Sequence, residues 1–170
     1  MSKVAVTDSA PTEIFGKRDN DLLLVNQTPN TMVSTAASVT GGIATISFTV
    51  LPGFIFVEIV GTWVFIAGFT GTDAVLNGAW QLISFGAGTF SFKINSGNFN
   101  ATSNGKIWDR GLIVVSDEWA ELTKSVRGQL PDGLLIAPGG GQIQWPRSPR
   151  KLWARSALYD AELQVQGGGA

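Results

Sequence analysis

The segment WPRSPRKLWARS, residues 145–156, gathers four cations and two tryptophans without an acidic residue. These side chains are Trp145, Arg147, Arg150, Lys151, Trp153 and Arg155. Arginine beside aromatic rings favours stacking and bidentate pairing, which is the chemistry of contact with a polyanion or a partner protein. The competing interpretation is a surface loop whose tryptophans fill the core. Because the formal net charge is −1, a protein contact is favoured over nucleic acid.

The carboxylates show no spacing that selects a site. They are scattered, and we expect solvated or helix-start positions for Asp73, Asp109, Asp117, Glu118 and Asp132. No D-x-D-x-D-G calcium loop is present. An enzyme that works through two carboxylates, such as a glycosidase, stays open as a class, but nothing singles out a pair.

Histidine and cysteine are both missing from the sequence. Their absence excludes Ser-His-Asp and Cys-His catalysis, disulfides and the usual zinc sites. APGGGQ, residues 137–142, lacks the Gly-Lys-Ser/Thr of a P-loop, so we interpret it as a turn that needs positive φ. We therefore expect no catalytic, cofactor-binding or metal-binding residue.

The elements that must position these residues are short strands. The chain has 170 residues, of which 44% are hydrophobic and 15% charged, and its 21 glycines indicate many turns. ATISFTVLP (44–52) and TFSFKI (89–94) alternate with period two, so Phe90, Phe92 and Ile94 should share a buried face. No apolar run approaches the roughly 20 residues of a membrane span, and no membrane partner is expected.

Two segments echo each other. GTWVFI (61–66) and GAWQLI (78–83) share Gly-x-Trp before alternating apolar residues, which predicts two strands of one barrel with Trp63 and Trp80 in its core. Asn77-Gly78 marks a turn. The other aromatic residues also belong to the core by default, although a sugar-binding platform is an alternative; Trp108 and Trp119 should be the exposed ones.

After residue 105 the pattern changes. A strand at 112–115 precedes a short helix at 116–127, which Ser116 can cap. The segment RKLWARSALYDAELQVQ (151–167) is ambiguous, because positions 154, 158, 161 and 165 fit a helix whereas AELQV alternates like a strand.

The segment from Val57 to Ile94 resembles a small β module common in bacteriophage virion proteins. Leu76-Asn77-Gly78 and Thr89-Phe90-Ser91-Phe92 carry the resemblance, which covers about residues 40–104. The pattern is also similar to a small β domain of ubiquitin-activating enzymes, in structure only. The flanks, with LLLVN, APGG, LWARS and AELQV, resemble a small β-sandwich of phage head and tail proteins. That resemblance implies that 152–166 forms a strand pair.

Together these observations predict an all-β fold with one short helix. A barrel-like module at 35–104 would be inserted in, or joined to, a sandwich-like domain formed by 1–34 and 105–170. The resemblance implies a virion protein made in the host cytoplasm, first as a capsid decoration or cement protein that contacts the major capsid protein. The alternative is a tail, tail-fibre or adaptor protein that contacts tail subunits and binds host glycans. We expect a homo-oligomer, with a trimer as one candidate.

Overall fold

The computed structural model describes residues 2–6, 9–15, 22–53, 60–110, 113–117, 122, 134–145, 151–156 and 161–167. Within these residues the chain is all-β with little helix. It divides into two compact units, one formed by 1–29 with 110–170 and the other by 30–109. The sequence-based boundaries, at 34/35 and 104/105, make the inserted unit five residues shorter at each end. The difference arises because the first barrel strand begins at Met32 and the last one ends at Trp108.

The unit at 30–109 is built on a closed antiparallel barrel of six strands in the order β10-β6-β7-β8-β5-β4, with β4 also paired to β10. The strands are β4 (Met32–Thr40), β5 (Ile43–Val50), β6 (Trp63–Ala67), β7 (Gly78–Gly86), β8 (Thr89–Lys93) and β10 (Lys106–Trp108). Lys106 pairs with Val33 and Ile107 with Met32, and this pairing of the last strand with the first closes the barrel. The first and last segments of this unit are therefore both barrel strands. Closure leaves these six strands without an open edge. A seventh strand, β9 (Phe99–Asn100), pairs with β4 further along.

Alternation fills the barrel with large apolar side chains. Phe90, Phe92 and Ile94 are all buried, which confirms the face predicted from TFSFKI. Ile46 on β5 and Ile66 on β6 are fully buried in the same cluster. The inward side chains pack against one another across the ring, so the barrel is a filled core and not a channel.

Both tryptophans were expected in the barrel core, and this prediction is correct for Trp80 but wrong for Trp63. Trp80 packs against the barrel core, stacks on Phe92 with ring centroids 4.7 Å apart, and donates from Nε1 to the Leu76 carbonyl at 2.8 Å. Trp80 is paired with the buried Val64, whereas Trp63 is paired with the exposed Gln81. Because neighbours along a strand face opposite sides, Trp63 lies on the outer face of the barrel.

A short 3₁₀ helix lies where the sequence indicated only a turn. Residues Gly71–Leu76 form a 3₁₀ helix, η1, before Asn77. Gly78 has the positive φ, 134°, while Asn77 keeps a φ of −72°. The Asn77 side chain instead holds the segment before the helix, since its Oδ1 accepts from the Phe69 N–H at 3.0 Å and its Nδ2 donates to the Phe69 carbonyl at 2.9 Å.

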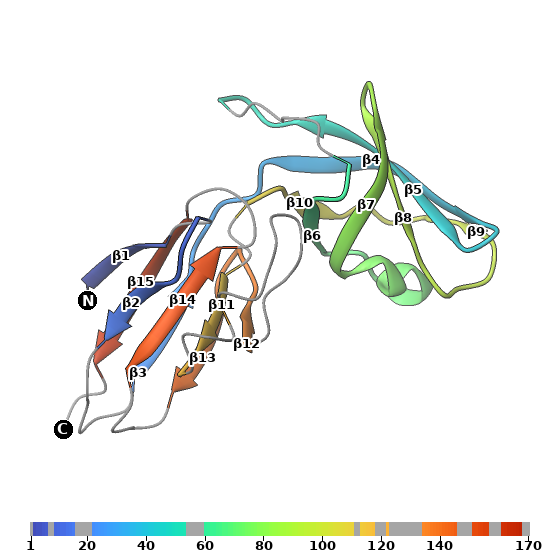
Figure 1. The fold of residues 1–170 in the computed structure, drawn as a ribbon. Helices are drawn as coiled ribbons and strands as arrows, with labels where there is room; N and C mark the ends of the chain where they lie inside the picture. Colours follow the sequence, from blue (N-terminus) through green and yellow to red (C-terminus); the bar gives the residue numbers. More distant parts are fainter. Residues whose placement is uncertain are drawn as a thin grey trace. The chain divides into compact units, whose positions relative to one another are not determined.

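The other unit contains two four-stranded antiparallel sheets (Figure 1), ordered β1-β15-β3-β13 and β12-β11-β14-β2. The first sheet contains β1 (Ser2–Val6), β15 (Ala161–Gly167), β3 (Leu22–Asn26) and β13 (Gly141–Trp145). The second contains β12 (Leu134–Ile136), β11 (Ile113–Ser116), β14 (Leu152–Ser156) and β2 (Thr12–Phe15). One core joins them, with Leu24 and Leu163 from the first sheet and Ile113 and Leu152 from the second. The unit is therefore a small β-sandwich.

The ambiguous segment at 151–167 forms strands where it is described. The helical interpretation is wrong there, because β14 and β15 are both extended. The expected strand pair is also wrong, because β14 pairs with β11 and β2 whereas β15 pairs with β1 and β3. As Figure 1 shows, β15 at the red end of the chain lies beside β1 at the blue end.

The helix expected at 116–127 falls mostly outside the described residues. Of this segment, Ser116 is the last residue of β11, and Leu122 has helical backbone and is fully buried. Within the described chain no helix has both the length and the apolar composition to cross a membrane.

Candidate functional site

The described residues of the basic and aromatic segment 145–156 are divided between the two sheets of the sandwich. Trp145 belongs to β13 in the first sheet of the sandwich, while Trp153 and Arg155 belong to β14 in the second. Trp145 is half-buried and packs against the sandwich core, as the alternative interpretation expected. Arg147 and Arg150 lie outside the described residues.

Lys151 and Trp153 do come together, and an acid joins them. The Lys151 ammonium lies 2.8 Å from a carboxylate oxygen of Glu13 and 5.8 Å from the centroid of the Trp153 ring. Glu13 on β2 is also the register partner of Trp153. The sequence scan missed Glu13 because 138 residues separate it from Lys151. The ion pair with Glu13 neutralises one of the four positive charges of segment 145–156, which makes this segment less suited to bind a polyanion.

Arg155 has a structural contact. Its Nη1 donates to the Leu122 carbonyl at 2.8 Å, and the side chain is half-buried. The hydrogen bond satisfies the backbone carbonyl of Leu122, whose side chain is fully buried. Arg155 therefore helps to hold the Leu122 segment on the second sheet.

Two of the scattered acids are buried. Asp73 lies in the first turn of η1, which is one of the two positions expected for it, whereas Asp109 is neither solvated nor at the start of a helix. Asp73 and Asp109 are each 2% exposed. Oδ2 of Asp73 accepts from the backbone N–H groups of Thr102 at 2.8 Å and Ser103 at 2.9 Å, and from their hydroxyls at 3.3 and 2.9 Å. The N–H groups of Ser103 and Thr102 lower the pKa of the Asp73 carboxyl, and burial opposes this shift only in part.

The Asp73 carboxylate connects η1 to the loop before β10 through these hydrogen bonds. This structural role uses the ionised form of the carboxylate. Glu118 and Asp132 lie outside the described residues, as does Trp119.

Trp108, which was expected on the surface, is only 5% exposed, and its ring centroid lies 5.8 Å from that of Phe65. In the described part of the chain no cluster of three or more acids could hold a metal ion.

The glycine-rich turn is structural, as predicted. Gly139 and Gly140 have φ values of 76° and 102°. Their N–H groups donate to the carbonyls of Thr28 at 3.0 Å and Asn26 at 2.7 Å. A side chain at Gly141 would place its Cβ 2.1 Å from the Ala137 carbonyl oxygen. The turn thus ties β12 and β13 to the end of β3, and the N–H groups of Gly139 and Gly140 are paired with backbone carbonyls.

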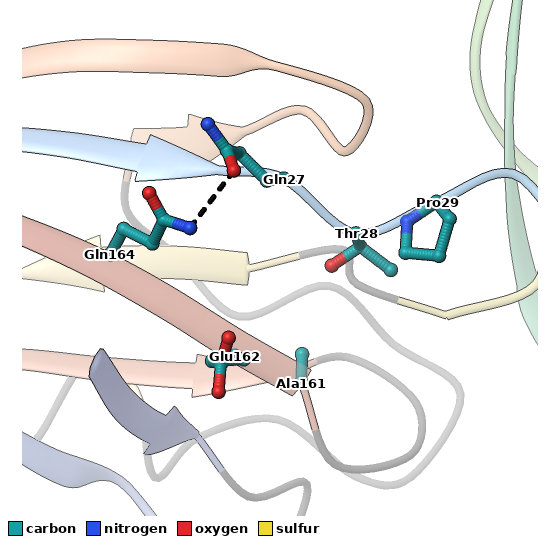
Figure 2. Close-up of a pocket in the computed structure, with 6 residues that line it drawn as sticks. All are labelled: Gln27, Thr28, Pro29, Ala161, Glu162 and Gln164. Carbon is teal, nitrogen blue, oxygen red and sulfur yellow. Dashed lines mark hydrogen bonds between the residues drawn. The ribbon is translucent and has the colours of Figure 1, made fainter.

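A hollow with a mixed polar and apolar lining lies beside this turn on the sandwich unit (Figure 2). It has a volume of about 310 Å³ and is lined by Gln27, Thr28, Pro29, Ala161, Glu162 and Gln164. Nε2 of Gln164 donates to Oε1 of Gln27 at 2.9 Å across it. The fully buried Asn26 orients Thr28, because its Oδ1 accepts from the Thr28 hydroxyl at 2.7 Å and its Nδ2 donates to the Ile136 carbonyl at 2.9 Å.

No protein-family model, curated protein or solved structure was found to match this chain. The function of the chain must therefore be inferred from its own surfaces. Besides the hollow, the described part of the barrel unit has four exposed large apolar side chains: Val60 at 61%, Val75 at 46%, Ile43 at 42% and Ile83 at 39%.

Val60 and Ile83 are held near each other by backbone hydrogen bonds. The Gly61 N–H donates to the Leu82 carbonyl at 2.8 Å, and the Leu82 N–H donates to the Thr62 carbonyl at 2.8 Å. Ile83 falls where the β7–β8 register shifts between Leu82 and Ser84, so the bulge directs its side chain outward. This pair was not predicted from the sequence, because the two residues are 23 positions apart and meet only through strand register.

Proposed function

We propose that this chain is a structural component of a bacteriophage virion, a capsid decoration protein that acts through protein–protein contacts. The exposed apolar pair Val60 and Ile83, on the outside of a closed barrel, is the observation that supports this proposal most directly. The half-buried Trp63 on the outer face of β6 extends the pair. Apolar side chains grouped on a rigid surface mark sites of association.

The magnitudes suit an assembly protein. Burying a fully exposed valine or isoleucine contributes about 1.5–3 kcal/mol, so this partly exposed pair would contribute about 1–2 kcal/mol per residue. One such contact is weak, but symmetry in a shell repeats it many times, and linked weak contacts combine into strong binding. Among the described strands of the sandwich, β1, β13, β12 and β2 stand at the edges of the two sheets, where strands of neighbouring subunits could be added.

The test mixes the purified full chain with expanded, undecorated phage heads and measures co-sedimentation. We expect the wild type to pellet with the heads and the double variant Val60→Asp/Ile83→Asp to bind at least tenfold more weakly. Val75→Asp is the matched control, because Val75 is also exposed, at 46%, but lies on η1. Circular dichroism checks that each variant is folded.

Two outcomes of this experiment contradict the proposal. The wild type could stay in the supernatant, or the double variant could pellet as well as the wild type. Sedimentation velocity of the free protein measures the oligomeric state, for which we expect a homo-oligomer, with a trimer as the first candidate.

The second candidate is a tail, tail-fibre or adaptor component that binds host glycans. The observation that favours it is the hollow on the sandwich, with its glutamine and glutamate side chains. Failure to sediment with heads, together with binding on a glycan array, would select this candidate.

A further inference from the structure

The outer face of the sheet β1-β15-β3-β13 is rich in glutamine. Leu24, Leu163 and Val165 point into the sandwich core, so the residues that alternate with them face outward. Strand register then places Lys3, Gln164, Val25 and Gln142 in one row across the four strands. Gln166, Leu23 and Gln144 form the next row. With Gln27, five of the seven glutamines of the chain lie on this face.

The hollow lies at one end of this face, and its polar groups are held in place. Figure 2 shows Gln27 and Gln164 joined through one half of each amide. Within the described part of the chain, Nε2 of Gln27 and Oε1 of Gln164 make no other hydrogen bond. Two donor hydrogens and one acceptor therefore remain beside each other at the hollow.

The charge at the hollow is balanced. Glu162 forms an ion pair with Lys3 at 2.7 Å, so these two side chains together add no net charge to the face. Both side chains are more than half exposed, so the pair is screened by solvent. The hollow therefore has little attraction for a phosphate or a metal ion, and its specificity must come from hydrogen bonds and shape.

The lining combines amides with apolar surface. Pro29 and Ala161 contribute carbon surface, while the two glutamines and Glu162 contribute donors and acceptors. A sugar ring has the matching composition, with C–H faces that pack on carbon and hydroxyls that both donate and accept. A volume of about 310 Å³ is at the lower end of small-ligand sites and suits one or two sugar rings.

We propose that this hollow, at the end of the glutamine-rich face, binds a neutral saccharide. Gln27 and Gln164 hydrogen-bond its hydroxyls, Glu162 accepts from another hydroxyl, and Pro29 packs against its C–H face. The rows that contain Gln142 and Gln166 lie along the same sheet and can accommodate further sugar units of a longer chain. This site is on the sandwich unit and does not depend on the Val60–Ile83 contact, so the two proposals can fail separately.

The experiment applies the full-length protein to an array of neutral and acidic glycans and then measures affinity for the best neutral oligosaccharide by calorimetry. We expect binding in the micromolar to millimolar range. Gln164→Ala and Gln27→Ala should each weaken it at least fivefold, because each removes a hydrogen bond to the sugar and disturbs the other amide. Gln81→Ala is the matched control: it removes an exposed glutamine of the barrel unit, which is not part of this sheet, and should change the affinity less than twofold.

Glu162→Gln separates the ligand classes. It keeps an acceptor of the same shape but removes the charge, so neutral saccharide binding should stay within about threefold. Absence of any neutral glycan on the array overturns the proposal. So does binding that is equal in both hollow variants and the wild type, or a ligand that is charged and lost with Glu162→Gln. A melting curve for each variant identifies loss of fold, and the two hollow variants provide independent readings.

Discussion

At the scale of single residues, Asp73 shows how a buried charge is used for structure. Its carboxylate accepts hydrogen bonds from two consecutive backbone N–H groups and two hydroxyls of residues 102 and 103. Donors that approach a carboxylate favour its ionised form, and this is the reason its pKa is lowered. The acid holds the loop that leads into β10, the strand that closes the barrel.

Asp73→Asn should lower the urea midpoint of unfolding at pH 7, because an amide accepts these hydrogen bonds less strongly than a carboxylate. The folded-state pKa lies below the ordinary value of 3.8, so the contribution of the carboxylate is complete above about pH 4. It is lost as the pH falls through the lowered folded-state pKa. The difference between wild type and Asp73→Asn should thus stay constant from pH 7 to about 4 and shrink below that.

Glu13→Gln is the control for this prediction. Glu13 forms only an exposed pair with Lys151, and such pairs contribute about 0–1 kcal/mol. A difference for Asp73→Asn that grows as the pH is lowered from 4 would contradict the assigned role, since it would mean that the neutral form is the one stabilised by folding.

At the scale of elements, strand register decides which aromatic residues stabilise the barrel. GTWVFI and GAWQLI have tryptophan at the same offset, but Val64 is opposite Trp80, so the two tryptophans lie on opposite faces. Trp80 has an aromatic partner inside the barrel, Phe92, and a hydrogen bond from its indole to the Leu76 carbonyl.

Trp80→Ala should destabilise the protein by about 3 kcal/mol, through loss of packing against the core and an unsatisfied carbonyl. Trp63→Ala should cost at most about 1 kcal/mol in the isolated protein, because Trp63 lies on the outer face and is half-buried. Urea unfolding followed by far-ultraviolet circular dichroism compares them. Equal losses would show that the assigned β6–β7 register is wrong.

At the scale of the whole molecule, the barrel is an insertion whose two ends meet. The Thr31 N–H donates to the Ile107 carbonyl at 3.0 Å, and the Asp109 N–H donates to the Thr31 hydroxyl at 3.4 Å. The chain therefore enters and leaves the barrel at neighbouring points, with the core of the barrel contained in residues 30–109. An insertion of this kind can fold as a unit.

Residues 30–109 expressed alone should fold cooperatively, because closure of the barrel satisfies its strands without help from the sandwich. The complementary chain, with 29 joined to 110 by a short glycine–serine linker, should also fold, since the ends it replaces are adjacent. Dispersed amide signals in nuclear magnetic resonance spectra and a single unfolding transition measure this. A barrel fragment without dispersed signals would show that its stability depends on the sandwich.

Much of this fold is readable from local pattern. Alternation in TFSFKI determined that Phe90 and Phe92 share a buried face, because side chains on a strand necessarily alternate. The glycines of 137–142 predicted a turn, since only glycine adopts the φ values of Gly139 and Gly140 without strain. Composition indicated many turns, and the alternating segments together with the resemblance indicated the all-β class.

Tertiary structure alone decided which residues meet. The pairing of Val64 with Trp80 turned Trp63 outward, and β14 and β15 joined different sheets although a short connection links them. Glu13 reached Lys151 from the other end of the chain, and the rows of glutamines formed only when β13, β3 and β15 aligned. Alternation specifies that a strand has two faces, but the partner strands and the register between them depend on the whole core, so the surfaces proposed to act are set by long-range packing.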